Sequence, residues 1–265
     1  MSLHFFLGRQ FLNVGAFLRS MAIMVMKPDD LIRFTRETYL QRGSIEAWAG
    51  KDVVDRGLNE PEEILLDRLP VKNGRMLLLG LGGGREAIPF AEAGFQVTGV
   101  DFVSELIALA VRNAEAKGLE IQGLVQDISD LKLPRSQYDV IWFSRSMYSV
   151  IPTQKRRLDM LRRIHDALRP NGHVVCQFFW DPAMTPGRKR LMIRRLIACL
   201  TLGNLTYEPG DILWGDIEFV HAFGSETDLR SEFARAGFEV IHLGIFENWH
   251  GGGAVLRKRP GVRNG

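Results

Sequence analysis

Three glycines and one aspartate are the residues of this sequence whose types and spacing point most directly to chemistry. Gly80, Gly82 and Gly84 alternate within the stretch MLLLGLGGGRE, and Asp101 follows seventeen residues after Gly84. A turn built from glycine lets a ligand approach the main chain, and a helix that begins there offers unpaired N–H groups. A carboxylate at the end of the next strand can accept both hydroxyl groups of a ribose. The pattern therefore predicts a site for a nucleotide-like ligand.

The spacing of the glycines separates this turn from the dinucleotide fingerprint. That fingerprint is G-x-G-x-x-G, and counted from Gly80 its third glycine would fall on Arg85. A nicotinamide-dependent oxidoreductase is therefore the weakest enzyme hypothesis. A glycine turn that only joins a strand to a helix is the simpler alternative. Farther along, Asp127 and Ile128 lie in VQDIS, where they could meet an adenine ring or belong to an ordinary loop.

These residues need a parallel sheet to bring them together. Helical patterns alternate with short apolar runs, which are RMLLLG, FQVTGVD, IQGLVQD, YDVIWFS and HVVCQFFW. Such alternation is typical of βαβ units and a parallel sheet. The last two runs, EVIHLGIF and GAVLRKR, are too close for a crossover helix, so we expect the final strand to be antiparallel. The sequence predicts a doubly wound α/β fold.

The chain divides by pattern into three parts, the second of which contains an insertion. Residues 1–70 read as an N-terminal helical cover, residues 71–258 as the main domain, and residues 259–265 as a tail. Inside the main domain, residues 182–221 read as a lid-like insertion. It contains the basic, apolar helix GRKRLMIRRLIACL and then a loop.

Composition excludes few classes of protein. The chain has 265 residues, 46% of them hydrophobic and 25% charged, and a net charge of +3, as in ordinary soluble domains. Bulk charge does not demand a nucleic-acid partner, and we expect no binding to DNA. Two cysteines are too few for a disulfide framework, and no His, Cys or carboxylate spacing suggests metal ligands. A cytoplasmic setting is expected.

Together the motifs resemble a class I S-adenosylmethionine-dependent methyltransferase. The matching pieces are MLLLGLGGGRE, VTGVD, VQDIS, YDVIWFSRSMYSVIP, LRPNGHVVCQF and the AGFEV…GGAVLRK ending, which together cover about residues 75–258. The resemblance implies a seven-stranded sheet with an antiparallel last strand, S-adenosylmethionine as cofactor and S-adenosylhomocysteine as product. It implies cofactor contacts from the glycine turn and the ends of the second, third and fourth strands, namely Gly80, Leu81, Gly82, Gly84, Asp101, Phe102, Asp127, Ile128 and Ser144. One departure is Leu78, where family members often carry an acidic residue.

The reaction implied is an in-line displacement at a methyl group on positively charged sulfur. Most of the rate then comes from holding the nucleophile in line. A general base is needed only for an acceptor that must lose a proton, such as a hydroxyl. We expect the acceptor beyond the strand ends, near Tyr148, Asp181, Trp214 and His221, with Tyr39 and Trp48 from the cover. His221 and Tyr148 are the predicted catalytic residues; the alternative for His221 is a hydrogen bond within its loop.

Two apolar, basic segments give information about a membrane partner and about the methyl acceptor. Residues 3–26 are interrupted by Arg9 and Arg19 and contain no uncharged run long enough to span a bilayer. With residues 188–200 they predict peripheral contact with the inner face of a membrane, and hence a small-molecule or amphiphilic, lipid- or glycan-linked acceptor. Helices packed on the protein's own core are the alternative. An RNA or protein methyltransferase and a non-catalytic cofactor-binding subunit also remain open, although SRSM stands where a flipped-base enzyme would carry an Asn-Pro-Pro-Tyr-like tetrapeptide. The sequence does not predict the oligomeric state.

Overall fold

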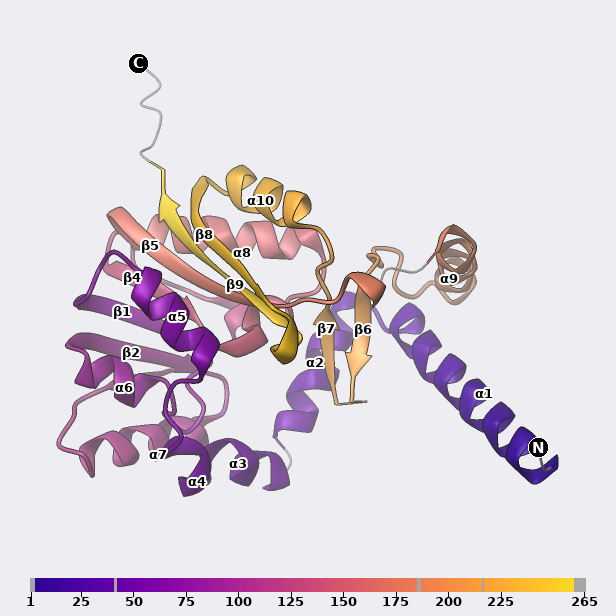
Figure 1. Ribbon diagram of the computed structural model, residues 1–265, viewed down its shortest axis with the longest axis horizontal. Helices are drawn as coiled ribbons and strands as arrows, with labels where there is room; N and C mark the ends of the chain where they lie inside the picture. The colour runs from indigo at the N-terminus through magenta and orange to yellow at the C-terminus, as the bar shows by residue number, and fades with distance from the viewer. Residues whose placement is uncertain (1–2, 41, 185–186, 216, 260–265) are drawn as a thin grey trace, which may run out of the picture.

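The computed structural model describes residues 3–40, 42–184, 187–215 and 217–259 (Figure 1). Its centre is a seven-stranded sheet in the order β3-β2-β1-β4-β5-β9-β8. The strands are β1 (Gly74–Leu79), β2 (Phe95–Asp101), β3 (Gln122–Val125), β4 (Tyr138–Phe143), β5 (Leu168–Phe179), β8 (Phe238–Phe246) and β9 (Gly251–Lys258). The first five are parallel, and β9 runs antiparallel to both β5 and β8. The predicted doubly wound sheet with an antiparallel last strand is confirmed.

Both faces of the sheet are buried because helices cover each of them. Alternate residues of β1 serve different cores: Leu77 and Leu79 face one, and Met76 and Leu78 face the other. Strands buried on both sides need apolar residues at every position, which is why β1 reads as an unbroken apolar run. One core includes α8 (Gln154–Ala167) and α10 (Glu226–Arg235), and the other includes α5 (Glu60–Arg68), α6 (Ala87–Glu92) and α7 (Ser104–Glu115).

The N-terminal helices differ in how much of the body they touch. They are α1 (Leu3–Val25), α2 (Pro28–Tyr39), α3 (Arg42–Ala49) and α4 (Lys51–Val54). The first half of α1 extends away from the sheet as an arm, whereas α2 lies beside the body and α3 reaches α7 (Figure 1). Among the described N-terminal helices, α5 packs directly on the sheet, against β9, whereas α3 reaches the body through α7.

The insertion after β5 contains the predicted α-helix and a β-hairpin that was not predicted. The predicted basic helix is present as α9 (Arg188–Thr201). The residues that follow were expected to form a loop, but β6 (Asp211–Trp214) and β7 (Glu218–His221) pair as an antiparallel hairpin. Strands of four residues carry too little alternation to be recognised in sequence.

Candidate active site

The glycine turn and Asp101 meet at the carboxyl ends of β1 and β2. Gly80 and Gly82 have φ values of 90° and 51°, which favour glycine. The N–H groups of Gly80 and Leu81 both donate to the Val100 carbonyl, at 2.9 and 3.0 Å. Asp101 accepts from the Gly82 N–H at 2.9 Å and from the Val103 N–H at 3.1 Å. Burial raises the pKa of Asp101, and these main-chain hydrogen bonds oppose the rise.

The residues of the turn do not all face the same space. A Cβ on Gly82 would meet only the Trp48 carbonyl, at 3.9 Å, so this position leaves room for a ligand. A Cβ on Gly84 would lie 3.3 Å from Ala110 of α7, so this glycine lets the turn pack on a helix. The Leu81 side chain is buried against Gly99. Leu81 can therefore offer only its main chain to a ligand, and contact of Gly84 and Leu81 with the cofactor stays a prediction.

Helix α3 and two aromatic side chains cover this turn. The Gly83 N–H donates to the Trp48 carbonyl at 3.3 Å. The Tyr39 ring lies 5.9 Å from Trp48 and 6.3 Å, edge on, from Phe102. The Tyr39 hydroxyl also donates to Glu218 at 2.6 Å. Tyr39 and Trp48, expected near an acceptor, thus lie over the carboxyl end of β2 together with Phe102.

Asp127 and Ile128 lie at the end of β3, where the sequence placed them. One Asp127 oxygen accepts from the Ser129 N–H at 2.8 Å and from its hydroxyl at 2.7 Å, which caps a 3₁₀ turn (Ile128–Asp130). The other oxygen is 3.9 Å from the Arg36 guanidinium, which also lies 5.7 Å from the Phe102 ring centre. Ile128 is buried in the core. Their contact with an adenine stays a prediction.

Glu86 is a buried carboxyl that the sequence analysis did not select. It accepts a hydrogen bond from the hydroxyl of Ser144, at the end of β4. Its Oε1 lies 3.0 Å from the Arg85 guanidinium yet has no hydrogen-bond partner among the described residues. Arg85 also pairs with Glu62 at 2.6 Å. Burial and the nearby Glu62 raise the pKa of Glu86 to about 8, against the opposing charge of Arg85. The signal in the sequence was the charged pair directly after the glycines, in a chain with Leu78 at the usual acidic position.

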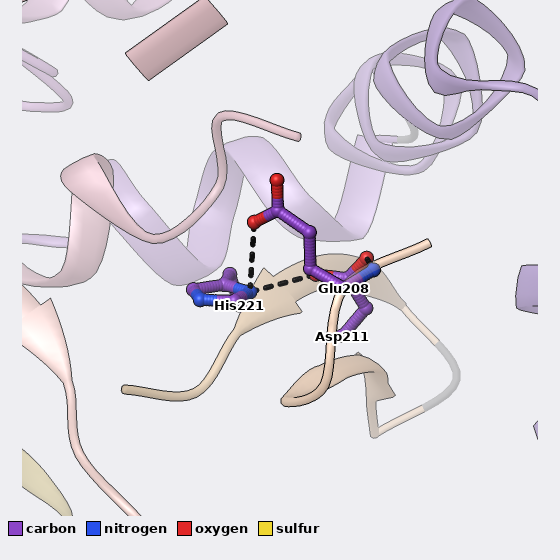
Figure 2. Close-up of side chains that lie close together, drawn as sticks. All are labelled: Glu208, Asp211 and His221. Atoms are coloured by element: carbon purple, nitrogen blue, oxygen red, sulfur yellow. Dashed lines mark hydrogen bonds and ion pairs between the residues drawn. The ribbon is translucent and has the colours of Figure 1, made fainter. Parts of the chain in front are cut away.

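His221 and Asp211 form a buried pair across the β6–β7 hairpin (Figure 2). His221 Nδ1 lies 2.7 Å from Asp211 Oδ1, and the two residues are 7% and 3% exposed. Since a carboxylate only accepts, Nδ1 carries the proton and Nε2 is the basic nitrogen. The Glu208 N–H holds Asp211, and the His221 N–H donates to the Ser149 carbonyl at 2.8 Å. Burial raises the pKa of Asp211, and the hydrogen bond to His221 opposes the rise.

Tyr148 is not placed to act on an acceptor, which corrects the prediction. Its side chain is fully buried, its hydroxyl donates to Glu232, and its ring stacks on Phe223 at 5.7 Å. Burial and Glu232 raise the pKa of Tyr148 well above its ordinary value, so it keeps its proton. A hydroxyl closed within the core has a structural role, because no substrate can reach it.

A buried arginine lies next to the histidine pair. Arg157 contacts Glu208 and Glu232, each at 2.8 Å, and Glu208 lies 3.8 Å from His221 Nδ1. Within the described ranges, Glu208, Asp211 and His221 are the one cluster whose ligand atoms lie close enough together to hold a metal ion. The Arg157 guanidinium already supplies the positive charge at Glu208. We therefore interpret the cluster as an ion-pair network rather than a metal centre.

Two further residues that were predicted to lie near the acceptor, Trp214 and Asp181, are found around the hairpin. Trp214 is partly exposed and packs on Phe179, with ring centres 4.8 Å apart. Phe179 belongs to a small apolar cluster with Val220 and Ala222, next to His221 in sequence. Asp181 caps a short turn through the Ala183 N–H at 2.9 Å, so its carboxylate is engaged locally.

Comparisons with known proteins agree with this architecture. Residues 76–172 match the family described as "Methyltransferase domain". A demethylmenaquinone methyltransferase from Thermus thermophilus is 29% identical over 188 residues, which is 67% of this chain and 79% of that protein. A ubiquinone biosynthesis O-methyltransferase from Ruegeria pomeroyi is 32% identical over 107 residues, 40% of this chain and 42% of that protein. A solved S-adenosylmethionine-dependent methyltransferase from Methanosarcina mazei superposes with a TM-score of 0.58 at 21% identity, covering 77% of this chain and all of that one.

Proposed function

The chain is a class I S-adenosylmethionine-dependent methyltransferase, and we propose that it methylates a hydroxyl oxygen of a small aromatic or amphiphilic acceptor. The buried His221–Asp211 pair is the observation that carries this proposal. A thioether or amine acceptor needs no base, whereas a hydroxyl must lose its proton as the oxygen attacks. A histidine whose tautomer is fixed by a buried carboxylate suits that task.

The residues at the glycine turn fit the cofactor. When bound, S-adenosylmethionine supplies a methyl group on a positively charged sulfur, an electrophile that is already activated. Gly82 leaves open space beside the main chain, and Asp101 stands at the strand end where a ribose would be held. Glu86 Oε1 lies 3.0 Å from the Arg85 guanidinium and has no hydrogen-bond partner among the described residues. We place the ammonium group of the cofactor at this oxygen, because Leu78 stands where family members often carry an acid. The Arg85 guanidinium donates to the Gly57 carbonyl and to Glu62, so its side chain points away from the glycine turn.

The proton of the acceptor hydroxyl passes to His221 Nε2 in this scheme. Asp211 holds the other ring nitrogen at 2.7 Å and stabilises the imidazolium that forms. Positioned general bases contribute roughly 10²–10⁴ in rate, and alignment of the oxygen with the methyl group contributes the rest. The proton later leaves to solvent, which returns the histidine to its starting form.

The surroundings of the hairpin favour an apolar acceptor. The His221 side chain shares its face of the hairpin with Leu213 and Phe219, and its ring centre lies 4.6 Å from that of Phe223. A sugar would need several polar partners here, whereas a ring or chain needs only such contacts. Two relatives are named a demethylmenaquinone methyltransferase and a ubiquinone biosynthesis O-methyltransferase, and these names support an acceptor of this kind.

The test separates the base from cofactor binding. Purified protein receives methyl-tritiated S-adenosylmethionine and a panel of phenolic and lipid extracts, while calorimetry measures S-adenosylhomocysteine binding. We expect His221→Asn and Asp211→Asn to bind S-adenosylhomocysteine normally but to lose about a hundredfold or more in transfer. His242→Asn, on β8, is the matched control and should stay active.

Three outcomes would contradict the proposal. Undiminished transfer by His221→Asn would exclude the base. When RNA and protein fractions are added to the panel, label found only in them would favour the macromolecular alternative. Tight binding of S-adenosylhomocysteine without transfer to any fraction would favour a non-catalytic cofactor-binding subunit.

A further inference from the structure

Exposed apolar side chains are concentrated on one side of the molecule. Of the eighteen large hydrophobic residues that are exposed in the described ranges, twelve lie on α1 or within residues 192–205. We call this region the α1–α9 surface, and its clearest members are Leu7, Phe11, Val14, Leu18, Val25, Met192, Ile193, Leu196, Leu200, Leu202 and Leu205. Soluble monomers rarely expose so many apolar side chains in one region without a partner.

The α1 members form a stripe rather than a scatter. Leu7, Phe11, Val14, Leu18 and Val25 recur at spacings of three, four or seven residues, so they share one side of the helix. Phe11 is 76% exposed and Leu18 is 59% exposed. No other described element covers this stripe, because the first half of α1 extends away from the body (Figure 1).

The stripe is anchored to the rest of the protein at one end. Ile23 and Met24, in the last turn of α1, are buried with Ala198 of α9 and with Tyr207 and Phe219. The Asn204 N–H also donates to the Met24 carbonyl at 2.7 Å. The two helices therefore present their exposed residues from a fixed base.

Charge identifies the kind of partner. Residues 1–28 and 182–207 together contain eight Lys and Arg and no Asp or Glu. Apolar helices with only basic charges fit the headgroup region of an anionic bilayer, where apolar groups enter the acyl boundary and cations stay with phosphates. A second copy of the same surface would bring like charges together. None of the described helices has both the length and the apolar character needed to cross a bilayer.

We propose that the α1–α9 surface docks on the face of a membrane that contains anionic lipid. The β6–β7 hairpin connects this surface to the candidate active site: Phe219 packs beneath α1 and α9, while Asp211 and His221 lie on the same two strands. Docking would thus place the base close to the plane from which an amphiphilic acceptor leaves. Only this last link rests on the proposed function; the docking itself does not.

Vesicle flotation of the full chain tests the docking without any methyl transfer. The probes are phosphatidylcholine vesicles with and without phosphatidylglycerol. We expect binding only when phosphatidylglycerol is present, and release by high salt. The triple variant Leu7→Gln, Phe11→Gln, Leu18→Gln should weaken binding about a hundredfold, and Lys189→Gln with Arg195→Gln about tenfold. All five side chains are exposed, so the fold should survive.

Two exposed residues outside the α1–α9 surface provide matched controls. Val125→Gln and Arg135→Gln remove an exposed apolar side chain and an exposed cation away from the surface, and both should bind as the parent does. Equal loss in these controls, or no binding of the parent to anionic vesicles, would overturn the proposal. A parent that is a dimer in light scattering, together with a triple variant that is a monomer, would also overturn the proposal, because a second copy of the chain would then cover the α1–α9 surface.

Discussion

At the residue scale, Glu86 couples the glycine turn to β4. Glu86 and Glu62 both pair with the same cation, Arg85. If both acids were ionised, the three buried groups would carry a net charge of −1. Burial makes that state costly, and the pKa of Glu86 rises to about 8 while that of Glu62 falls. One acid of the pair therefore keeps its proton at neutral pH.

This proton makes stability depend on pH with a defined sign. The folded chain holds it up to about pH 8, whereas the unfolded chain releases it near 4.5. The folded state thus binds more protons within this window, so stability falls as pH rises through it. Between about pH 6 and pH 9 we expect the parent to lose unfolding free energy on the order of a few kcal/mol, as measured by urea unfolding. Glu86→Gln should not show this loss. An equal change in unfolding free energy with pH in parent and variant would contradict this prediction.

The same substitution should affect the cofactor. At about pH 9, where Glu86 is ionised, a neutral amide attracts an ammonium group less than the carboxylate does. We therefore expect Glu86→Gln to weaken S-adenosylhomocysteine binding at least about tenfold at that pH, as measured by calorimetry. Glu92→Gln is the matched control, because Glu92 ends α6, whereas Glu86 directly precedes that helix. Equal affinity in the two variants would place the ammonium group elsewhere.

At the element scale, Arg157 joins α8 to α10 and to the segment before β6. It is 1% exposed and contacts Glu208 and Glu232, each at 2.8 Å. Arg157→Met leaves two carboxylates without their cation, and we expect a loss of about 3–5 kcal/mol in unfolding free energy. Arg162→Met, exposed on the same helix, should change it by no more than about 0.5 kcal/mol. A similar effect in both variants would show that the network contributes little.

Helix α3 depends on the absence of a side chain at Gly83. A Cβ there would lie 2.6 Å from Ala49 Cα and 2.9 Å from the Trp48 carbonyl, so the helix must move. We expect Gly83→Ala to lift the cover and weaken S-adenosylhomocysteine binding about fivefold or more, a change of roughly 1 kcal/mol. Gly15→Ala, in open space on α1, should bind as the parent does. Unchanged affinity in Gly83→Ala would mean that the cover does not shape the site.

At the scale of the whole molecule, cofactor binding and folding are coupled. A ligand that binds only the folded state at a hundred times its Kd adds about 2.7 kcal/mol. For a chain of this size we expect S-adenosylhomocysteine to raise Tm by roughly 5–10 °C in calorimetry. Asp101→Ala should abolish most of that shift, because the turn loses the carboxylate that Gly82 and Val103 hold. A full shift in this variant would remove Asp101 from the site.

The sequence by itself determined the parts whose residues lie close together along the chain. The strands, the glycine turn with Asp101 at the next strand end, and the antiparallel β9 follow from periodicity and spacing, which are local signals. The basic helix after β5 was local too. Each was predicted at about the position where the structure has it.

Tertiary structure alone decided which side chains meet. The spacing of Tyr148 was compatible with an acceptor pocket, but only packing shows that it points into the core toward Glu232, eighty-four residues away. His221 gained Asp211 through a hairpin too short to leave a pattern, and Glu86 gained Ser144 across fifty-eight residues. Such pairs depend on how a sheet and its insertions fold over one another, and no local preference of the chain encodes that.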